Sequence, residues 1–184
     1  MKIILNGCYG GFSLSYEAMF LYLYAKNQKA YFYKDISVYD DYTKVHKYER
    51  ITLQEIRELK TSRFIYCTTE DQGKYLDHFP ENIVNDRDLD RTDPILVSVV
   101  ETIGSDAASG RFASLYIEEV PNGTQYKIDN YDGIEELITK DDDDWKTAID
   151  QSQSSHSQTC IKNLWSVIKP DPILDPDLMF KEWE

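Results

Sequence analysis

The first part of the chain alternates short apolar runs with polar turns. Lys2–Leu5 ends in three consecutive apolar residues, a run of strand length, and we expect a buried strand there. The apolar segment Tyr16–Ala25 has helical length, and we expect a helix with Ser13 or Ser15 as its N-cap. A glycine-rich turn, Asn6–Phe12, lies between the two. The pattern therefore predicts a strand–turn–helix unit.

The next segments predict a smaller set of strands and one short helix. Lys29–Lys34 and Arg63–Thr68 have the composition of strands. Thr52–Lys60 places its apolar residues on one face of a short helix. Ile36–Tyr48 is rich in Tyr, Asp and Lys with little periodicity, and we interpret it as a loop with one short strand.

A helix is also expected in the second half of the chain. Asp93 supplies an N-cap carboxylate directly before Pro94, which suits the first helical position. The apolar stretch Ile95–Ile103 follows, and Gly104 is a typical stop signal.

Two alternating segments follow that helix. Ser114–Val120 and Thr124–Tyr131 are separated by a Pro-Asn-Gly turn, and we expect them to form a hairpin. Asp132-Gly133 then ends the second strand, and Ile134–Thr139 is expected to begin another short helix. These elements predict an α+β (mixed α/β) fold, in which a small sheet including a hairpin in the C-terminal half packs with two or three helices.

The character of the chain changes near residue 140. Residues 1–140 carry the apolar pattern of one compact domain. Residues 141–184 form a polar, low-complexity linker and a Pro-rich C-terminal tail. We expect the tail to dock partly on the domain through Met179, Phe180 and Trp183.

The net charge and the spacing of the cysteines exclude several classes of protein. The formal net charge is −13, which repels phosphodiester backbones and argues against binding a nucleic acid polymer. Cys8, Cys67 and Cys160 are widely spaced, as expected for a reducing compartment. We find no pattern of a signal peptide or of a membrane span. The sequence predicts a soluble cytoplasmic protein with no membrane partner.

The glycine turn is the first candidate site. Its glycines let a ligand approach the main chain closely, and the start of the following helix is expected to leave N–H groups free for an anion. The turn lacks the features of a P-loop or a dinucleotide fingerprint, so no cofactor is predicted. The alternative is a tight turn whose aromatic rings fill the core. The candidate ligand-binding residues of this turn are Asn6, Cys8, Tyr9, Gly10, Gly11 and Phe12.

An arginine cluster near the Asp93 helix is the second candidate. Arg87 and Arg91 are two of only six arginines, and an arginine just before a helix can bind a phosphate or carboxylate in a bidentate manner. We add Asp93 to this candidate ligand site. The alternative is a local salt bridge from Arg91 to Asp93 or Asp90. The neighbouring aspartates resemble the start of a calcium loop but lack its glycine and final glutamate, so no metal site is predicted.

Catalytic residues are harder to assign. Cys8 is a candidate nucleophile near a helix start, but a small buried thiol is the competing role, and the histidines show no signature that pairs one with it. The carboxylates of the expected hairpin, such as Glu118 and Asp132, offer an acid pair, although carboxylates on such a surface are mostly solvated. We therefore assign no catalytic residue.

Several of these motifs together resemble a known family. They are Asn6-x-Cys-Tyr-Gly-Gly-Phe-x-Leu-Ser15, Arg91-Thr-Asp-Pro94, Ala108-Ser-Gly110 and Tyr131-Asp-Gly133. This combination is similar to a family of small, largely uncharacterised bacteriophage and prophage proteins, over about residues 1–136 with gaps. The resemblance implies a phage context and a host cytoplasm, and it implies no particular activity.

These observations lead to one main hypothesis and two alternatives. The main hypothesis is a non-catalytic binder of a small anionic, nucleotide-like ligand, which would sequester a host immune signalling nucleotide in an anti-defence role. In this view the main-chain amides and Arg91 hold phosphates while Tyr9 and Phe12 stack a base. The alternatives are a hydrolase or transferase using Cys8 or acidic residues, and an acidic interaction protein that inhibits a host factor. A homodimer stays open in each case.

Overall fold

The computed structural model describes residues 1–40, 43–59, 64–139, 146–147 and 155–168. Its elements are β1 (Lys2–Asn6), α1 (Tyr16–Ala25), β2 (Tyr31–Asp35), β3 (Val38–Asp40), β4 (Thr43–Val45), β5 (Tyr48–Ile51), α2 (Leu53–Arg57), β6 (Ile65–Thr68), β7 (Tyr75–Leu76), the 3₁₀ turn η1 (Asp86–Asp88), α3 (Pro94–Ile103), α4 (Ser105–Ala108), β8 (Leu115–Glu119), β9 (Gln125–Tyr131), β10 (Ile134–Thr139), β11 (Lys146–Thr147) and α5 (Ser155–Ile168). This content confirms the predicted α+β class.

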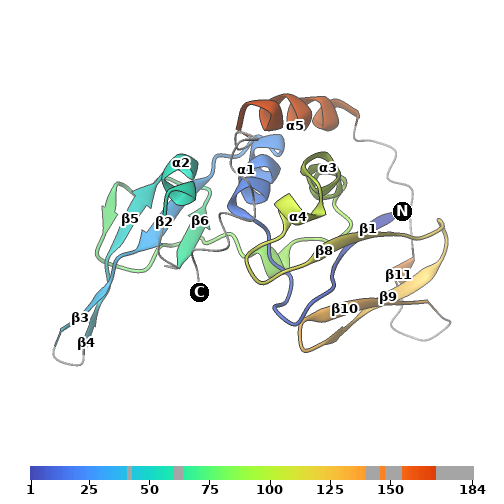
Figure 1. Cartoon of the computed structure of the whole chain (residues 1–184), viewed down its shortest axis with the longest axis horizontal. Coiled ribbons are helices and arrows are strands. Elements are labelled where there is room, and N and C mark those ends of the chain that lie inside the picture. Colours follow the sequence, from blue (N-terminus) through green and yellow to red (C-terminus); the bar gives the residue numbers. More distant parts are fainter. Residues whose placement is uncertain (41–42, 60–63, 140–145, 148–154, 169–184) are drawn as a thin grey trace.

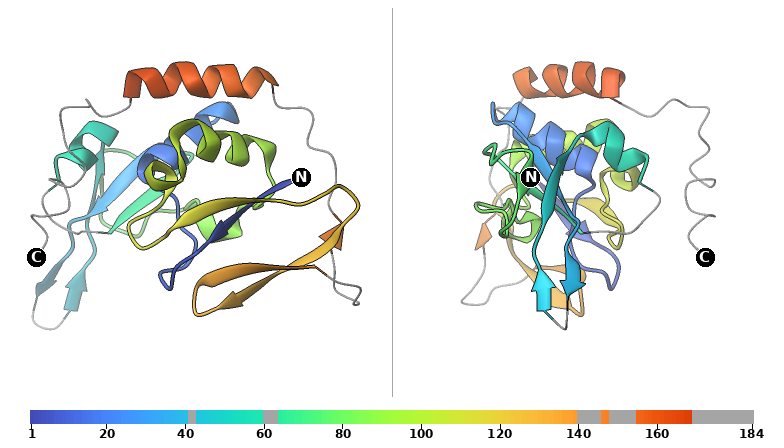
Figure 2. Two further views of the ribbon diagram at one scale, coloured as in Figure 1. Left: turned by 45° about the vertical axis from the view of Figure 1, so that its right-hand side comes forward. Right: turned by 90° about the vertical axis from the view of Figure 1, so that its left-hand side faces the viewer.

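Helices α1, α3 and α4 lie between two regions of antiparallel strands (Figure 1). One region is a four-stranded sheet in the order β6-β2-β5-β7, with α2 beside it. The other holds the β1–β8 pair and the sheet β10-β9-β11. Helices α1 and α3 pack on each other, and α5 lies across both of them, as the two rotated views in Figure 2 also show.

Local sequence explains the helix starts. Ser15 caps α1, because its hydroxyl accepts a hydrogen bond from the Ala18 amide, as the pattern predicted. Thr52 and Glu55 form a reciprocal capping box at α2. At α3, Asp93 is the N-cap and Pro94 the first helical residue, and the helix ends at Gly104 with φ of 89°. This segment confirms its prediction.

Strand β1 is buried on both faces. Ile4 packs into the main core with α1, α3 and β2, whereas Ile3 and Leu5 pack on the opposite side with Val120 and Tyr126. This arrangement explains why the strand is a continuous apolar run and does not alternate. It also places the end of β1, where the glycine turn begins, between the helices and the β9–β10 hairpin.

The hairpin prediction needs correction. Strand β8 pairs with β1, and the hairpin of the C-terminal half is formed by β9 and β10. Ile134–Thr139, expected as a helix, is therefore a strand. The reason is the Asp132-Gly133 turn: both residues have positive φ, 51° and 95°, as a tight type I′ hairpin turn requires. The sequence pattern alone predicts only the end of a strand at this turn.

Two other segments differ from expectation. Ile36–Tyr48 holds the paired strands β3 and β4 and the start of β5, in place of a loop with one strand. Helix α5 lies in the segment expected as a polar appendage, and it buries Ile161 against α1 and α3. The proposed docking residues Met179, Phe180 and Trp183 lie outside the described residues. No helix in the described ranges has the length and apolar character needed to cross a bilayer.

Candidate functional site

Asn6, the last residue of β1, organises the glycine turn. Its side chain has no exposed surface, and its Nδ2 donates to the carbonyl oxygens of Cys8 (2.6 Å) and Gly133 (2.7 Å). Its Oδ1 accepts from the Ser114 amide at 2.8 Å. One buried amide therefore ties together the turn, β8 and the hairpin. Asn6, predicted to contact a ligand, lies in the framework of the site.

Two glycines let the turn and the hairpin pack backbone to backbone. A Cβ at Gly10 would lie 1.5 Å from the Phe112 carbonyl oxygen. A Cβ at Gly133 would lie 2.6 Å from the Tyr9 carbonyl oxygen and 2.7 Å from the Gly11 nitrogen. Only glycine fits at either position. The hairpin turn is thus held in a fixed place above the glycine turn.

A cavity of about 450 Å³ lies between the glycine turn, the 87–91 segment and the hairpin. Six of the nine predicted ligand-binding residues line it: Tyr9, Gly10, Gly11, Phe12, Arg87 and Arg91. The hairpin contributes four more: Asn130, Asp132, Gly133 and Glu135. The prediction missed the hairpin side as a wall of this site; the Asp-Gly turn was the one local signal that a hairpin forms there.

Arg91 is held by an aromatic ring and a carboxylate. Its guanidinium carbon lies 3.1 Å from the centroid of the Phe12 ring, and its Nη2 donates to Glu135 Oε1 at 3.1 Å. Glu135 Oε2 accepts from the Asn6 amide at 3.0 Å. The salt bridge expected from Arg91 to Asp93 or Asp90 is therefore made to Glu135.

Burial shapes the electrostatics of Arg91. Desolvation lowers the pKa of its guanidinium from the ordinary value, while the charges of Glu135 and Asp86 act to raise that pKa. The guanidinium remains cationic at neutral pH, since arginine is not deprotonated in proteins. Its Nη1 is buried and has no hydrogen-bond partner within the described ranges.

Arg87 is the second cation of the cavity. It lies in η1, where Asn85 Oδ1 accepts from its main-chain amide at 3.2 Å. Its side chain is exposed, and Nη2 lies 3.9 Å from the point that a Cβ of Gly11 would occupy. Among the residues that the structure describes, the Arg87 guanidinium makes no ion pair or hydrogen bond.

The start of α1 does not face this cavity. Ser15 Oγ accepts from the Ala18 amide at 3.1 Å, and Asp86 Oδ2 accepts from the Leu14 amide at 3.0 Å. The protein's own side chains thus occupy these two amides, and no residue of α1 is among the described residues that line the cavity, so the amides expected at the helix start do not serve this site. The turn itself differs: the main-chain amides of Tyr9 and Gly10 have no partner in the described part of the chain.

Two other predicted residues do not line the cavity. Cys8 Sγ donates to the Phe112 carbonyl at 3.0 Å, which holds the thiol as a donor on the outer side of the turn. Asp93 caps α3 and also accepts from the Tyr22 hydroxyl (2.9 Å) and Lys26 Nζ (3.0 Å). Burial acts to raise the pKa of Asp93, but these bonds to Lys26, the α3 amide and Tyr22 hold it below the usual range.

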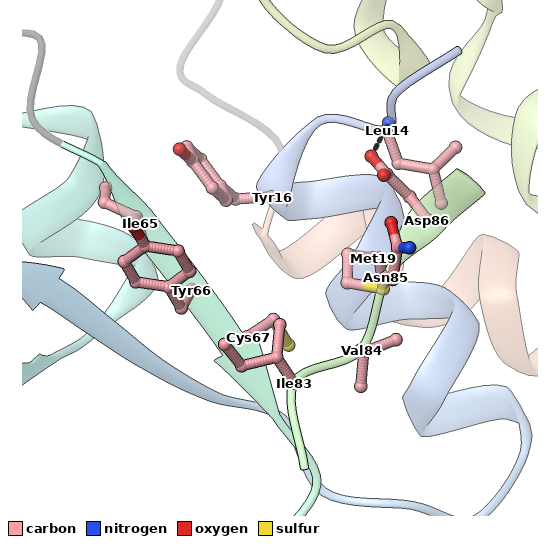
Figure 3. A pocket seen from close by; sticks show the side chains of 10 residues that line it. All are labelled: Leu14, Tyr16, Met19, Ile65, Tyr66, Cys67, Ile83, Val84, Asn85 and Asp86. Carbon is pink, nitrogen blue, oxygen red and sulfur yellow. Dashed lines mark hydrogen bonds between the residues drawn. The ribbon is translucent and has the colours of Figure 1, made fainter. Parts of the chain in front are cut away.

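The remaining titratable groups lie elsewhere. His46 contacts the Tyr48 hydroxyl and His78 contacts Asp77, both in or beside the four-stranded sheet and away from Cys8. A separate cavity of about 300 Å³ lies between β6 and α1 (Figure 3), and burial raises the pKa of its Cys67 thiol to about 12. The described residues contain no group of three or more His, Cys, Asp or Glu side chains placed to hold a metal ion.

Comparison with protein-family models, curated proteins and solved structures finds no match for this chain.

Proposed function

We propose that the protein binds a small anionic, nucleotide-like ligand in the cavity between the glycine turn and the hairpin, and performs no chemistry on it. The observation that carries the proposal is the set of donors around one cavity: the Arg87 guanidinium and the turn amides, which have no partner among the described residues, and the largely buried Arg91. Buried polar groups in folded proteins nearly always find a partner, so the buried Arg91 Nη1, which has none among the described residues, supports a place for another molecule at this cavity. Arg87 and the turn amides are exposed donors available to the same ligand.

The anionic end of the ligand is assigned to the Arg87 side. A guanidinium forms short, charge-assisted hydrogen bonds to phosphate and carboxylate oxygens. Gly11 lets such a group approach the main chain closely, because it carries no Cβ between the turn and Arg87. Arg91 adds positive charge but is partly neutralised by Glu135, so Arg87 contributes the larger part of anion affinity.

The nucleotide-like character is supported by size and aromatic surface. A volume of about 450 Å³ is within the range of small-molecule pockets. Tyr9 lines the cavity with 68% of its surface exposed, which leaves its ring open to a planar base. The net charge of −13 disfavours a long nucleic acid, but one phosphate group beside a local arginine is compatible with it.

The proposed biological role rests on the expected resemblance of the sequence motifs to phage proteins. A phage protein that holds a nucleotide without turnover lowers its free concentration in the host cell. We therefore propose sequestration of a host signalling nucleotide as the role of the binding. This step rests on the family resemblance and on the binding proposal together.

The test is calorimetric titration of the purified protein with a panel of nucleotides and cyclic nucleotides, followed by chromatography of the recovered ligand. We expect binding of at least one member and its recovery intact. Arg87→Ala should weaken binding about 10- to 100-fold, the loss of one charge-assisted hydrogen-bonding group. Arg50→Ala is the matched control, since Arg50 lies in the four-stranded sheet and pairs with Asp71.

Other outcomes identify the alternatives. A converted ligand in the chromatogram, lost in Cys8→Ser, would indicate an enzyme. A salt-sensitive complex with a host protein, with no nucleotide bound, would indicate an acidic interaction protein. Binding that is equally weakened by Arg87→Ala and Arg50→Ala would reject the proposed cavity.

A further inference from the structure

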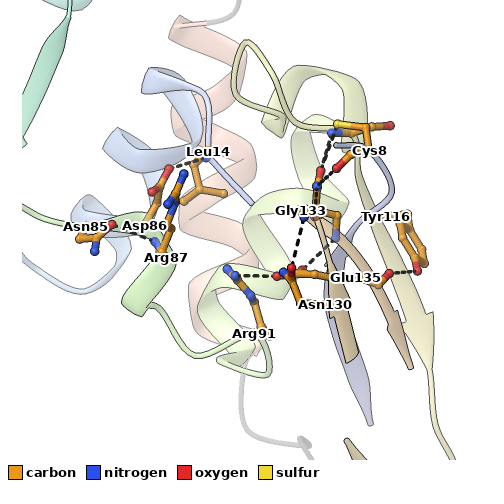
Figure 4. Close-up of polar contacts among 12 residues, drawn as sticks. Cys8, Leu14, Asn85, Asp86, Arg87, Arg91, Tyr116, Asn130, Gly133 and Glu135 are labelled. Atoms are coloured by element: carbon orange, nitrogen blue, oxygen red, sulfur yellow. Dashed lines mark hydrogen bonds and ion pairs between the residues drawn. The ribbon is translucent and has the colours of Figure 1, made fainter. Parts of the chain in front are cut away.

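The two long walls of the cavity have opposite polarity. Arg87 and Arg91 come from the segment before α3, and Asn130 and Glu135 come from the hairpin (Figure 4). Asp132 also lines the cavity on the hairpin side. Arg91 and Glu135 pair where the two sides meet, so a ligand that fills the cavity meets Arg87 on one side and Asp132 on the other. The anionic group of the ligand can pair only with the arginine side of the cavity.

The two carboxylates of the hairpin wall are not equivalent. Both oxygens of Glu135 are occupied, one by Arg91 and one by the Asn6 amide, and the side chain is almost fully buried. Asp132 is exposed at the tip of the turn, and its carboxylate makes no hydrogen bond or ion pair with any residue that the structure describes. Asp132 is thus the carboxylate available to a ligand.

Asp132 is also held firmly in place. It occupies a positive-φ position of the type I′ turn, and the next residue, Gly133, packs against the glycine turn with no room for a Cβ. Asn130 Oδ1 accepts from the Gly133 amide at 3.2 Å, which closes the turn from inside. The turn therefore fixes the backbone of Asp132, so only the torsions of its side chain need to be ordered when a ligand binds, and this favours selectivity.

Resting on the proposed function, we propose that the cavity selects a guanine nucleotide, with its phosphate at Arg87 and its base edge at Asp132. An ionised carboxylate only accepts hydrogen bonds, and its two oxygens match two adjacent N–H donors. Guanine presents such a pair, N1–H and the 2-amino group. Adenine and cytosine place a ring-nitrogen acceptor beside a single amino donor, and that acceptor would face a carboxylate oxygen.

The experiment compares GMP, IMP and AMP by calorimetry with the wild-type protein and with Asp132→Asn. IMP keeps N1–H but lacks the 2-amino group. For the wild-type protein we expect GMP to bind about tenfold more tightly than AMP, with IMP between them, as loss of a hydrogen bond to a charged group implies. Asp132→Asn should remove the preference and bind AMP at least as tightly, because a negative charge is removed. Asn-Gly is a favoured type I′ turn, so this variant is expected to fold.

Asp129→Asn is the matched control, since Asp129 is an exposed carboxylate of β9 that does not line the cavity. It should keep the preference for GMP. Equal affinities for the three nucleotides in the wild-type protein, or a preference that survives Asp132→Asn, would overturn the inference while leaving the proposed function intact. If none of the three binds and the wider nucleotide panel also fails, both proposals are rejected.

Discussion

The four-stranded sheet and the cavity region contain similar side chains, but they differ in where the polar groups find partners. In the sheet, Tyr33 is fully buried and its hydroxyl accepts from the Gln72 amide at 2.8 Å. On the same side of the molecule Arg50 pairs with Asp71, and Lys34 pairs with Glu49. These polar side chains of the sheet therefore find their hydrogen-bond and ion-pair partners within the protein.

In the cavity region the framework side chains are also hydrogen-bonded within the protein, but several groups that line the cavity have no partner among the described residues. Asn6 and Glu135 use their side-chain oxygens on the protein itself. Arg87, Asp132 and the amide of Gly10 have no partner among the described residues. The comparison teaches that the satisfied groups hold the fold here, whereas the exposed groups beside the cavity, together with the buried Arg91 Nη1, are the ones available to another molecule.

The largest expected effect comes from the backbone contact that closes the cavity region. In Gly10→Ala the new Cβ would lie 1.5 Å from the Phe112 carbonyl oxygen, so the turn must move. We expect a loss of more than about 4 kcal/mol in the free energy of unfolding, measured by urea denaturation. Gly7→Ala is the control, because its Cβ would meet neighbours at an ordinary 3.5 Å. Similar stability of the two variants would contradict the packing described.

The next effect tests the buried ion pair against the surface pair of the sheet. Glu135→Ala leaves Arg91 without its carboxylate in a largely buried position, and we expect a loss of about 3 kcal/mol in the free energy of unfolding. Asp71→Ala removes the exposed partner of Arg50 and the acceptor of the Gly73 amide, and should cost only about 1 kcal/mol. Equal losses in both variants would mean that the two regions do not differ as proposed.

A smaller, pH-dependent effect is expected at Asp93. Its folded-state pKa is depressed, so the stabilisation it provides is present above its unfolded pKa of about 3.9 and is lost as pH falls through the folded value. Asp93→Asn keeps an N-cap but loses the charge beside Lys26, and should cost about 1 kcal/mol at pH 7. Thermal melts at pH 7 and pH 3 should show this difference shrinking at the lower pH. A stability difference between the wild-type protein and Asp93→Asn that is the same at both pH values would contradict the stabilising role of the ionised Asp93.

Modification of the thiols Cys8 and Cys67 is used to compare their reactivity, and here we expect the smallest effect on stability. Burial raises the pKa of Cys67 to about 12, and Cys8 lies on the partly exposed turn. At pH 8 we expect iodoacetamide to modify Cys8 in the folded protein and Cys67 only after unfolding. Peptide mapping by mass spectrometry separates the two sites. Rapid modification of Cys67 in the folded protein would show that its side chain is not enclosed as described.

Local sequence signals predicted the elements that carry their own start and stop residues. The strand–turn–helix unit around Gly10 and the helix from Pro94 to Gly104 follow from glycine, proline and cap positions. They also placed Arg87 and Arg91 as candidates, and the structure brings both to the cavity with the turn. These features depend on neighbours in the chain, which is why the pattern finds them.

The partners across the sheets were not predictable in the same way. Asn6 meets Glu135 over a separation of 129 residues, and no local pattern encodes that contact. The sequence analysis expects a helix at Ile134–Thr139, because a short apolar run is ambiguous between helix and strand, but the segment is a strand. The positive-φ turn before it indicates a strand once it is recognised as a hairpin turn. The hairpin wall of the cavity was missed for this reason.

The most direct test of the central claim is an NMR titration of ¹⁵N-labelled protein with GMP. If the open groups of the cavity bind the ligand, the amide signals of Tyr9, Gly10 and Gly133 and the Arg87 Nε signal should shift and saturate together, while the sheet amides near Tyr33 stay in place. Shifts confined to the sheet, or none in the glycine turn while calorimetry detects binding, would contradict the account.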